Sequence, residues 1–82
     1  MAGVGQNRPM RIEYDPRVDS AYIYLTEEAL TPGRESVPVG PSDEIPAMVV
    51  LDQKDGKLVG LEIVGAKTYL PADLLAGAEI IG

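Results

Sequence analysis

Residues 45–66 read IPAMVVLDQKDGKLVGLEIVGA, and this stretch decides the fold. Two apolar runs flank a short polar segment that ends in Asp55 and Gly56. An Asp-Gly pair between apolar runs is the usual signal of a β-hairpin, and Gly56 supplies the positive φ that a bulged hairpin turn needs. The first run, Ile45–Asp52, has no polar face over its apolar part, so we expect a central strand buried on both sides.

The second run, Lys57–Ala66, is the expected partner strand of this hairpin. Its alternation predicts one face with Val59, Leu61 and Ile63, and another with Leu58, Gly60, Glu62 and Val64. A glycine inside a strand indicates a bulge, a bend or the close approach of another backbone, which we expect at Gly60. An unpaired buried carboxylate is costly, so Glu62 needs a reason to stand in this strand. Either its face is exposed, or it pairs with Arg11, Arg17 or Lys67, or it lies at an interface.

A second hairpin is predicted near the N-terminus. From Met10 the sequence alternates, with Ile12 and Tyr14 on one face and Arg11 and Glu13 on the other, as in a strand. A turn follows in which Pro16 suits the second position, and Asp15 and Asp19 are explained as turn residues that bond the local backbone. The next strand runs from Ser20 to Leu25, with Ala21, Ile23 and Leu25 opposite Tyr22 and Tyr24.

The remaining segments contribute less to the expected fold. Residues 1–9 are predicted to be a disordered tail, residues 26–33 a helical turn stopped by Pro-Gly, and residues 40–44 a loop. Glu35 to Val39 is a third strand, which Pro38 confines to an edge or a bulge. Pro71 and Gly77 bound a short helix, and residues 78–81 pack or add a short strand. Residues 10–82 thus form one α+β domain, mostly β: an antiparallel meander of about five strands with one short C-terminal helix.

Composition excludes several classes of function. The 82 residues include 7 basic and 13 acidic side chains, for a net charge of −6, and no cysteine, histidine, tryptophan or phenylalanine. Thiolate and imidazole catalysis within one chain are therefore impossible, and a zinc site is disfavoured. The basic residues are interrupted by acidic ones, which argues against direct nucleic-acid binding. No apolar run approaches the length of a membrane span, so we expect a cytoplasmic protein without a membrane partner and without a cofactor.

Two motifs resemble those of a known family of very short bacterial and archaeal proteins. The first is Tyr14-Asp15 followed by Asp19-Ser20-Ala21-Tyr22-Ile23-Tyr24-Leu25. The second is Leu51-Asp52, then Asp55-Gly56-Lys57-Leu58-Val59-Gly60-Leu61-Glu62-Ile63, then Ala66. Over about residues 10–76 the chain resembles domain-of-unknown-function family 2283. The resemblance implies a small β-rich fold, no assigned activity and, more loosely, an antitoxin-type partnership with a small toxin-like protein.

Four carboxylates raise the possibility of metal-assisted hydrolysis. If Asp15, Asp19, Asp55 and Glu62 met at one end of the sheet, they would form a hard-cation site or an acid–base pair. The segment around Asp55 also invites comparison with a calcium-binding loop, but Leu51 stands where the first ligand belongs. A small carboxylate-dependent metal-binding hydrolase is therefore the alternative function.

The leading hypothesis is a non-enzymatic protein-interaction module. A domain of this size has a thin core, and without disulfides the remaining means of stabilisation is self-association or a partner chain. We therefore expect a homodimer, formed by pairing of exposed strand edges, and a small basic protein as a further partner of the acidic surface. Tyr14, Tyr22 and Tyr24 either pack a second layer or belong to an interface. With them, Asp15, Asp19, Asp55, Gly56, Gly60 and Glu62 are the candidate interface or motif residues.

Overall fold

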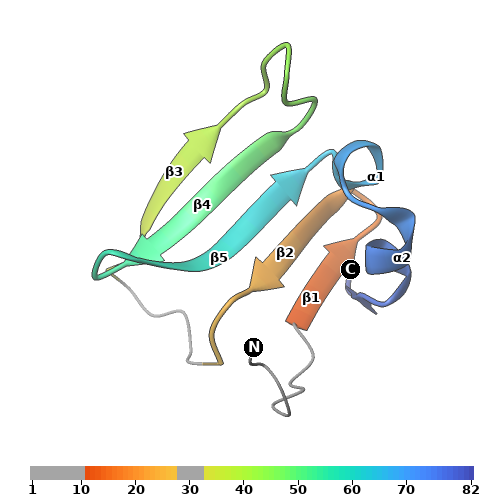
Figure 1. The fold of residues 1–82 in the computed structure, drawn as a ribbon. Helices are drawn as coiled ribbons and strands as arrows, with labels where there is room; N and C mark the ends of the chain where they lie inside the picture. Colours follow the sequence, from red (N-terminus) through yellow and green to blue (C-terminus); the bar gives the residue numbers. More distant parts are fainter. Residues whose placement is uncertain (1–10, 28–32) are drawn as a thin grey trace, which may run out of the picture.

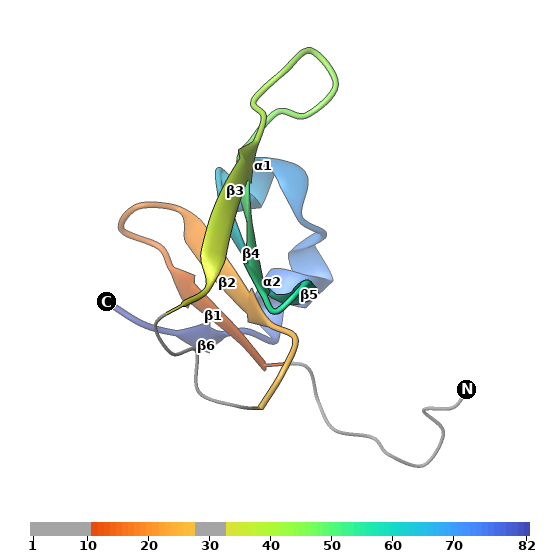
Figure 2. The same cartoon turned by 90° about the vertical axis from the view of Figure 1, so that its left-hand side faces the viewer.

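Figure 1 shows the computed structural model of the chain, in which residues 11–27 and 33–82 are described. The tail expected at residues 1–9, and most of the turn expected at residues 26–33, lie outside the described residues. Connection 40–47, between β3 and β4, extends beyond the sheet in Figure 2, which is viewed from the β3 side.

The described residues form a six-stranded sheet and two short helices, so the mostly β class is confirmed. The strands are β1 (Arg11–Asp15), β2 (Ser20–Tyr24), β3 (Glu35–Val39), β4 (Met48–Lys54), β5 (Lys57–Val64) and β6 (Glu79–Ile80). Their order is β3-β4-β5-β2-β1-β6, and every pair is antiparallel except β1 with β6. The two expected hairpins therefore meet through β5 and β2, and β3 is an edge strand, as Pro38 predicts.

The β4–β5 hairpin contains both a tight turn and a bulge. Lys54 pairs with Lys57, and the two residues between them both have positive φ, 53° at Asp55 and 76° at Gly56. This is the two-residue turn typical of Asp-Gly, without a bulge inside the turn. The bulge lies further along: Asp52 pairs with Gly60 and Gln53 with Leu58. The extra residue, Val59, places Leu58 on the same face as Gln53. The strict alternation expected for this strand is therefore wrong before Gly60, since Leu58 does not share a face with Gly60 and Glu62.

The chain leaves the sheet earlier than expected. The predicted strand to Ala66 is wrong at its end, because β5 stops at Val64 and Gly65 adopts a positive φ of 95°. The chain then forms α1 (Ala66–Tyr69), which the sequence did not predict, and α2 (Ala72–Ala76), the short helix expected after Pro71. Gly77 ends α2, as predicted.

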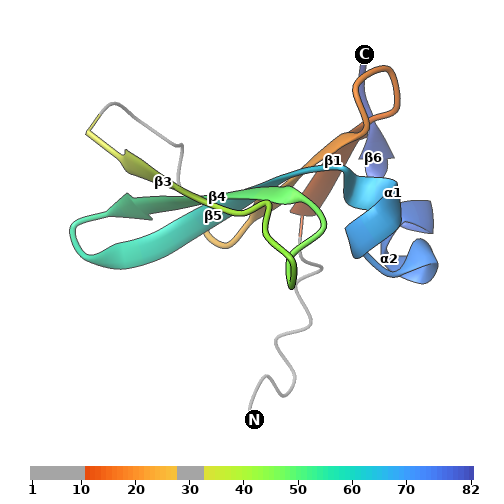
Figure 3. The ribbon, with the colours of Figure 1, turned by 90° about the horizontal axis from the view of Figure 1, so that it is seen from above.

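The helices cover only part of one sheet face. The buried core contains Ile12, Tyr14, Ala21, Ile23, Ala47, Ile63 and Ala66, and the helix residues Leu70, Leu74 and Leu75 pack against it. In Figures 1 and 3 both helices lie beside the β1–β2–β5 end of the sheet, away from β3. The expectation that β4 is buried on both sides is therefore wrong, and Met48 is 36% exposed.

Exposure increases along a single apolar row of this helix-bearing face. The row crosses the sheet through Ile12, Ile23, Leu61, Leu51 and Val37. Ile12 and Ile23 are 8% and 7% exposed, Leu61 and Leu51 are half-buried, and Val37 is 43% exposed. Beyond the described helices, the same face carries Val37 and Leu51 of this row and, in the adjacent rows, Val39 and Leu58; we call these four side chains the β3–β5 apolar surface.

Candidate functional site

The opposite sheet face carries polar and aromatic side chains, and none of the described helices lies against it (Figure 3). Strand pairing places three cross-sheet rows on it. They are Arg11–Tyr24–Gly60–Asp52–Ser36, Glu13–Tyr22–Glu62–Val50–Pro38 and Asp15–Ser20–Val64–Met48. We call this surface the open face. It holds five of the nine candidate residues from the sequence: Asp15, Tyr22, Tyr24, Gly60 and Glu62.

A buried carboxylate, Asp52, organises the centre of the open face. It is only 4% exposed and accepts hydrogen bonds of 2.6 Å from the hydroxyls of Tyr22 and Ser36. The Arg34 Nε lies 3.6 Å from the Oδ2 atom of Asp52, the oxygen that also accepts the hydrogen bond from Tyr22. Burial alone would raise the pKa of Asp52, but the two hydroxyl donors and the Arg34 charge outweigh it and lower the pKa. Burial and the neighbouring Asp52 charge in turn raise the pKa of Tyr22.

Gly60 makes room for this arrangement; the bulge expected near it is confirmed, whereas the expected approach of another backbone is wrong. A Cβ added to Gly60 would collide with the Tyr22 hydroxyl and lie 2.6 Å from its Cζ. The close neighbour is thus a tyrosine side chain from β2 rather than backbone. Asp52 was not among the candidate residues, because it reads as the polar end of an apolar strand. Its position opposite a mid-strand glycine was the signal that could have found it.

A second cluster of polar side chains lies on β1 and β2. The Tyr24 hydroxyl donates a 2.7 Å hydrogen bond to Glu13, and Arg11 forms a 2.9 Å ion pair with the same carboxylate. The hydroxyl of Tyr24, more than Arg11, lowers the pKa of Glu13 against the opposing effect of burial. The Arg11 guanidinium also lies 4.2 Å from the Tyr24 ring centroid, and the rings of Tyr22 and Tyr24 meet edge to face at 4.7 Å.

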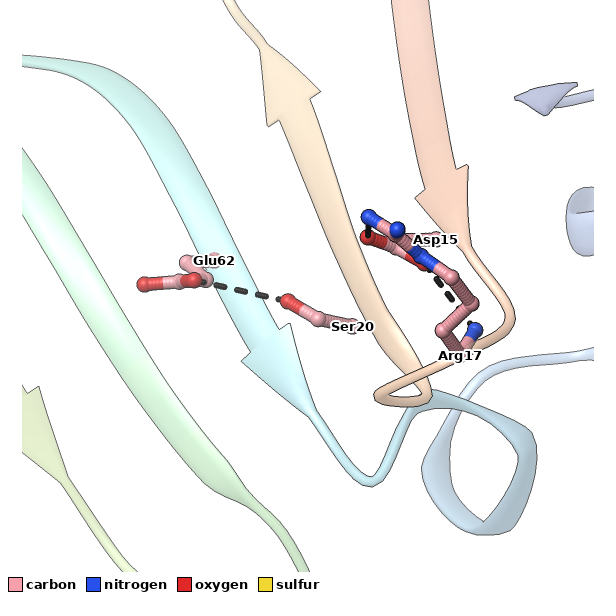
Figure 4. A network of polar contacts seen from close by, with 4 residues as sticks. All are labelled: Asp15, Arg17, Ser20 and Glu62. Carbon is pink, nitrogen blue, oxygen red and sulfur yellow. Dashed lines mark hydrogen bonds and ion pairs between the residues drawn. The ribbon is translucent and has the colours of Figure 1, made fainter. Parts of the chain in front are cut away.

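Glu62 lies half-buried on the open face with Ser20 as its neighbour. The Ser20 hydroxyl donates to its Oε2 at 3.4 Å, as Figure 4 shows. Of the basic residues considered as partners, Arg11 pairs with Glu13 and Arg17 pairs with Asp15 at 3.0 Å. The Arg17 side chain lowers the pKa of Asp15. Asp15 also accepts a 2.9 Å hydrogen bond from the Arg17 backbone N–H, which confirms its role as a turn residue.

Tyr14 and Asp19 join the first hairpin to α1. Asp19 has a positive φ of 55°, and its Oδ1 accepts bonds from the Tyr14 hydroxyl at 2.7 Å and the Lys67 backbone N–H at 3.0 Å. Its backbone carbonyl accepts from the N–H groups of Gly65 and Ala66. These donors, with the Tyr14 hydroxyl first, lower the pKa of Asp19. Asp19 is a turn residue, as predicted, but the expectation that it bonds local backbone is wrong, because the backbone N–H groups that it accepts from belong to residues 65–67 at the start of α1.

The structure does not bring the four carboxylates of the metal-site hypothesis together. Asp55 lies in the β4–β5 turn, whereas Asp15 and Asp19 flank the β1–β2 turn at the other end of the sheet (Figure 1). Within residues 11–27 and 33–82, no group of three or more acidic side chains is placed to hold a metal ion. Gly56 likewise serves the hairpin turn. These carboxylates therefore do not form the site that metal-assisted hydrolysis needs.

The polar groups of the open face satisfy one another's hydrogen bonds and keep their usual charge states near neutral pH. In the described part of the chain, every buried side-chain nitrogen or oxygen has a hydrogen-bond partner. The acid groups with shifted pKa values remain ionised near neutral pH, and the tyrosines with shifted values remain protonated. None of the described helices is long and apolar enough to cross a membrane.

Comparison with known proteins identifies one family. A family model described as a protein of unknown function, DUF2283, matches residues 11–67, which include both hairpins, β3 and the start of α1. No match was found among curated proteins or among solved structures.

Proposed function

The chain belongs to the DUF2283 family, whose function is unknown, and we propose that it is a non-enzymatic protein-interaction module. In this proposal two copies associate through the β3–β5 apolar surface. The observation that carries it is the row of apolar side chains that runs from 8% exposure at Ile12 to 43% at Val37. An apolar row that continues beyond its helical cover favours contact with another polypeptide.

The face of the sheet is better suited to this contact than its edge. Pro38 has no N–H, so the ladder bonds to β4 around it come from Val37 and Val39. The outward edge of β3 therefore lacks a donor at residue 38, and a strand added there would lose a hydrogen bond. The β3–β5 apolar surface, rather than the strand edge, is therefore the proposed contact.

A second copy is the occupant that we favour. The four side chains of this surface are uncharged, and the carboxylate that borders it, Glu35, is exposed, so two chains of net charge −6 can meet there through apolar contacts. A two-fold dimer also brings the same patch from each copy together, which suits an apolar surface. The acidic balance of the rest of the molecule supports the further proposal of a small basic protein as partner, in the manner of an antitoxin.

The mass of the protein in solution tests the homodimer. We expect light scattering after size-exclusion chromatography to give twice the chain mass of 8.7 kDa at micromolar concentration. Val37→Asp should give the monomer mass, because it buries a charge in the contact. Val64→Asp is the matched control, since Val64 is 41% exposed on the open face, and should remain dimeric. A wild-type monomer, or dissociation by both variants alike, would contradict the proposed contact.

A further inference from the structure

We propose that the open face binds a basic polypeptide segment, and that an arginine or lysine side chain of that segment pairs with Glu62. The proposal rests on the role of the chain as a protein-interaction module, but it does not depend on the homodimer, which uses the other face. It names the chemistry of the partner and the side chain that receives it.

The charge pattern of the open face points to this residue. Three of its carboxylates already have a cation: Glu13 has Arg11, Asp15 has Arg17 and Asp52 has Arg34. Within the described residues, Glu62 pairs with no lysine or arginine, and its one hydrogen-bond donor is the Ser20 hydroxyl at 3.4 Å. The face therefore presents one carboxylate whose charge is not balanced by a neighbour.

Apolar side chains next to Glu62 favour a long basic side chain over a free ion. Glu62 stands between Tyr22 and Val50 in its row, and the neighbouring row contains Val64 and Met48, which are 41% and 36% exposed. Lysine and arginine carry an aliphatic stem that packs on such a surface while the charged group reaches a carboxylate. A hydrated metal ion would not find three converging acidic ligands here, since the described residues contain no such group.

The open face does not suit a second copy of the same chain. An isologous contact centred on Glu62 would bring two unbalanced carboxylates together, in a molecule that already has a net charge of −6. An extended segment with a basic side chain at every second position complements the same face, because it directs its cations and their aliphatic stems to one side at the spacing of a strand. The partner is therefore a basic protein segment.

A peptide titration tests this inference. The probe is a fluorescein-labelled peptide, Gly-Arg-Leu-Arg-Leu-Arg-Gly, and its matched control has glutamine at each arginine. Binding is followed by fluorescence anisotropy and located by backbone amide shifts in ¹⁵N spectra. We expect the arginine peptide to bind, the glutamine peptide to bind much more weakly, and the shifts to centre on Tyr22, Glu62 and Val64.

Two isosteric variants separate a specific pair from general attraction. Glu62→Gln and Glu35→Gln each remove one negative charge, but Glu35 is exposed on β3 and pairs with Gln53 across from it. We expect Glu62→Gln to weaken binding about fivefold, the upper end of what an exposed ion pair contributes, and Glu35→Gln to change it less than about twofold. Equal losses, or shifts elsewhere on the molecule, would overturn the proposal.

The test also distinguishes this inference from the homodimer. The monomeric variant Val37→Asp keeps the open face and should bind the arginine peptide as the wild type does. If the wild type is a dimer but binds neither peptide, the Glu62 inference fails and the homodimer stands. If the wild type is a monomer and the arginine peptide binds at Glu62, the homodimer fails and the Glu62 inference stands.

Discussion

Gly60→Ala is the substitution for which the structure gives the sharpest expectation. The new methyl group would occupy the space of the Tyr22 hydroxyl and lie 2.6 Å from Cζ and 3.0 Å from Cε2 of that ring. Since the ring is held between β4 and the Tyr24 ring, it must shift or the strand must bend. Either response breaks the 2.6 Å hydrogen bond to Asp52, which is nearly inaccessible to water.

The cost follows from that lost hydrogen bond and from overpacking. A hydrogen bond to a charged group contributes about 1.5–3 kcal/mol, and an added methyl group in a filled space costs about 1–3 kcal/mol. The two effects overlap, because moving the ring relieves the collision and breaks the bond together. We therefore expect the free energy of unfolding to fall by about 2–4 kcal/mol, which corresponds to a melting temperature about 10–25 °C lower.

Urea denaturation followed by circular dichroism measures this loss. Gly77→Ala is the matched control, because Gly77 has a φ of −91° and a Cβ there would lie no closer than 3.8 Å to any other group. It should be neutral or slightly stabilising. In a Tyr22→Phe background the hydroxyl is already gone, so Gly60→Ala should cost less than in the wild type. If Gly60→Ala proves no more destabilising than Gly77→Ala, the packing argument for the open face is wrong.

Two further predictions concern the other buried or capping carboxylates. The pKa of Asp52 is lowered in the folded state, so its stabilising effect is complete above the ordinary value of 3.8 and is lost as pH falls below it. Asp52→Asn should therefore flatten the loss of stability as the pH falls from about 5 to about 2, as measured by urea midpoints, and an unchanged slope would contradict this. Asp19→Ala should lower the melting temperature, because α1 loses its cap at the Lys67 N–H, whereas Asp43→Ala, in an exposed loop, should not. Equal melting temperatures for these two variants would refute the capping role.

The two hairpins and the edge strand could be predicted because their causes are local. Alternation over five residues and a turn residue at the right place are sufficient for β1 and β2, and Asp55-Gly56 sets the turn of the second hairpin. Pro38 predicts that β3 is an edge strand, because proline has no N–H to donate to a second neighbouring strand. Family membership was likewise recognisable from short motifs, which lie in these same hairpins.

The features that could not be predicted depend on contacts between distant residues. The start of α1 is set by Asp19, which is 48 positions away from Lys67. Asp52 is buried by partners that lie 30 and 16 residues earlier in the chain, Tyr22 and Ser36. The face of Leu58 changed because one extra residue, Val59, entered the ladder. The alternation of apolar and polar residues does not indicate which distant residues form hydrogen bonds or where a bulge shifts the register. Each of these residues was therefore assigned from its local pattern alone.

The two faces of the sheet differ in the side chains that they expose to water. The homodimer and the contact with a basic segment are therefore proposed on opposite faces. On the open face, tyrosine hydroxyls and arginines complete the hydrogen bonds of the carboxylates, and among the described residues Glu62 is the carboxylate of this face without a cationic partner. The other face has apolar side chains, and helices of four and five residues are too short to cover them as far as Val37. In the proposed homodimer, a second copy buries that surface. Because the two surfaces lie on opposite sides of one sheet, a homodimer would keep both of its open faces accessible, and each could bind a basic segment.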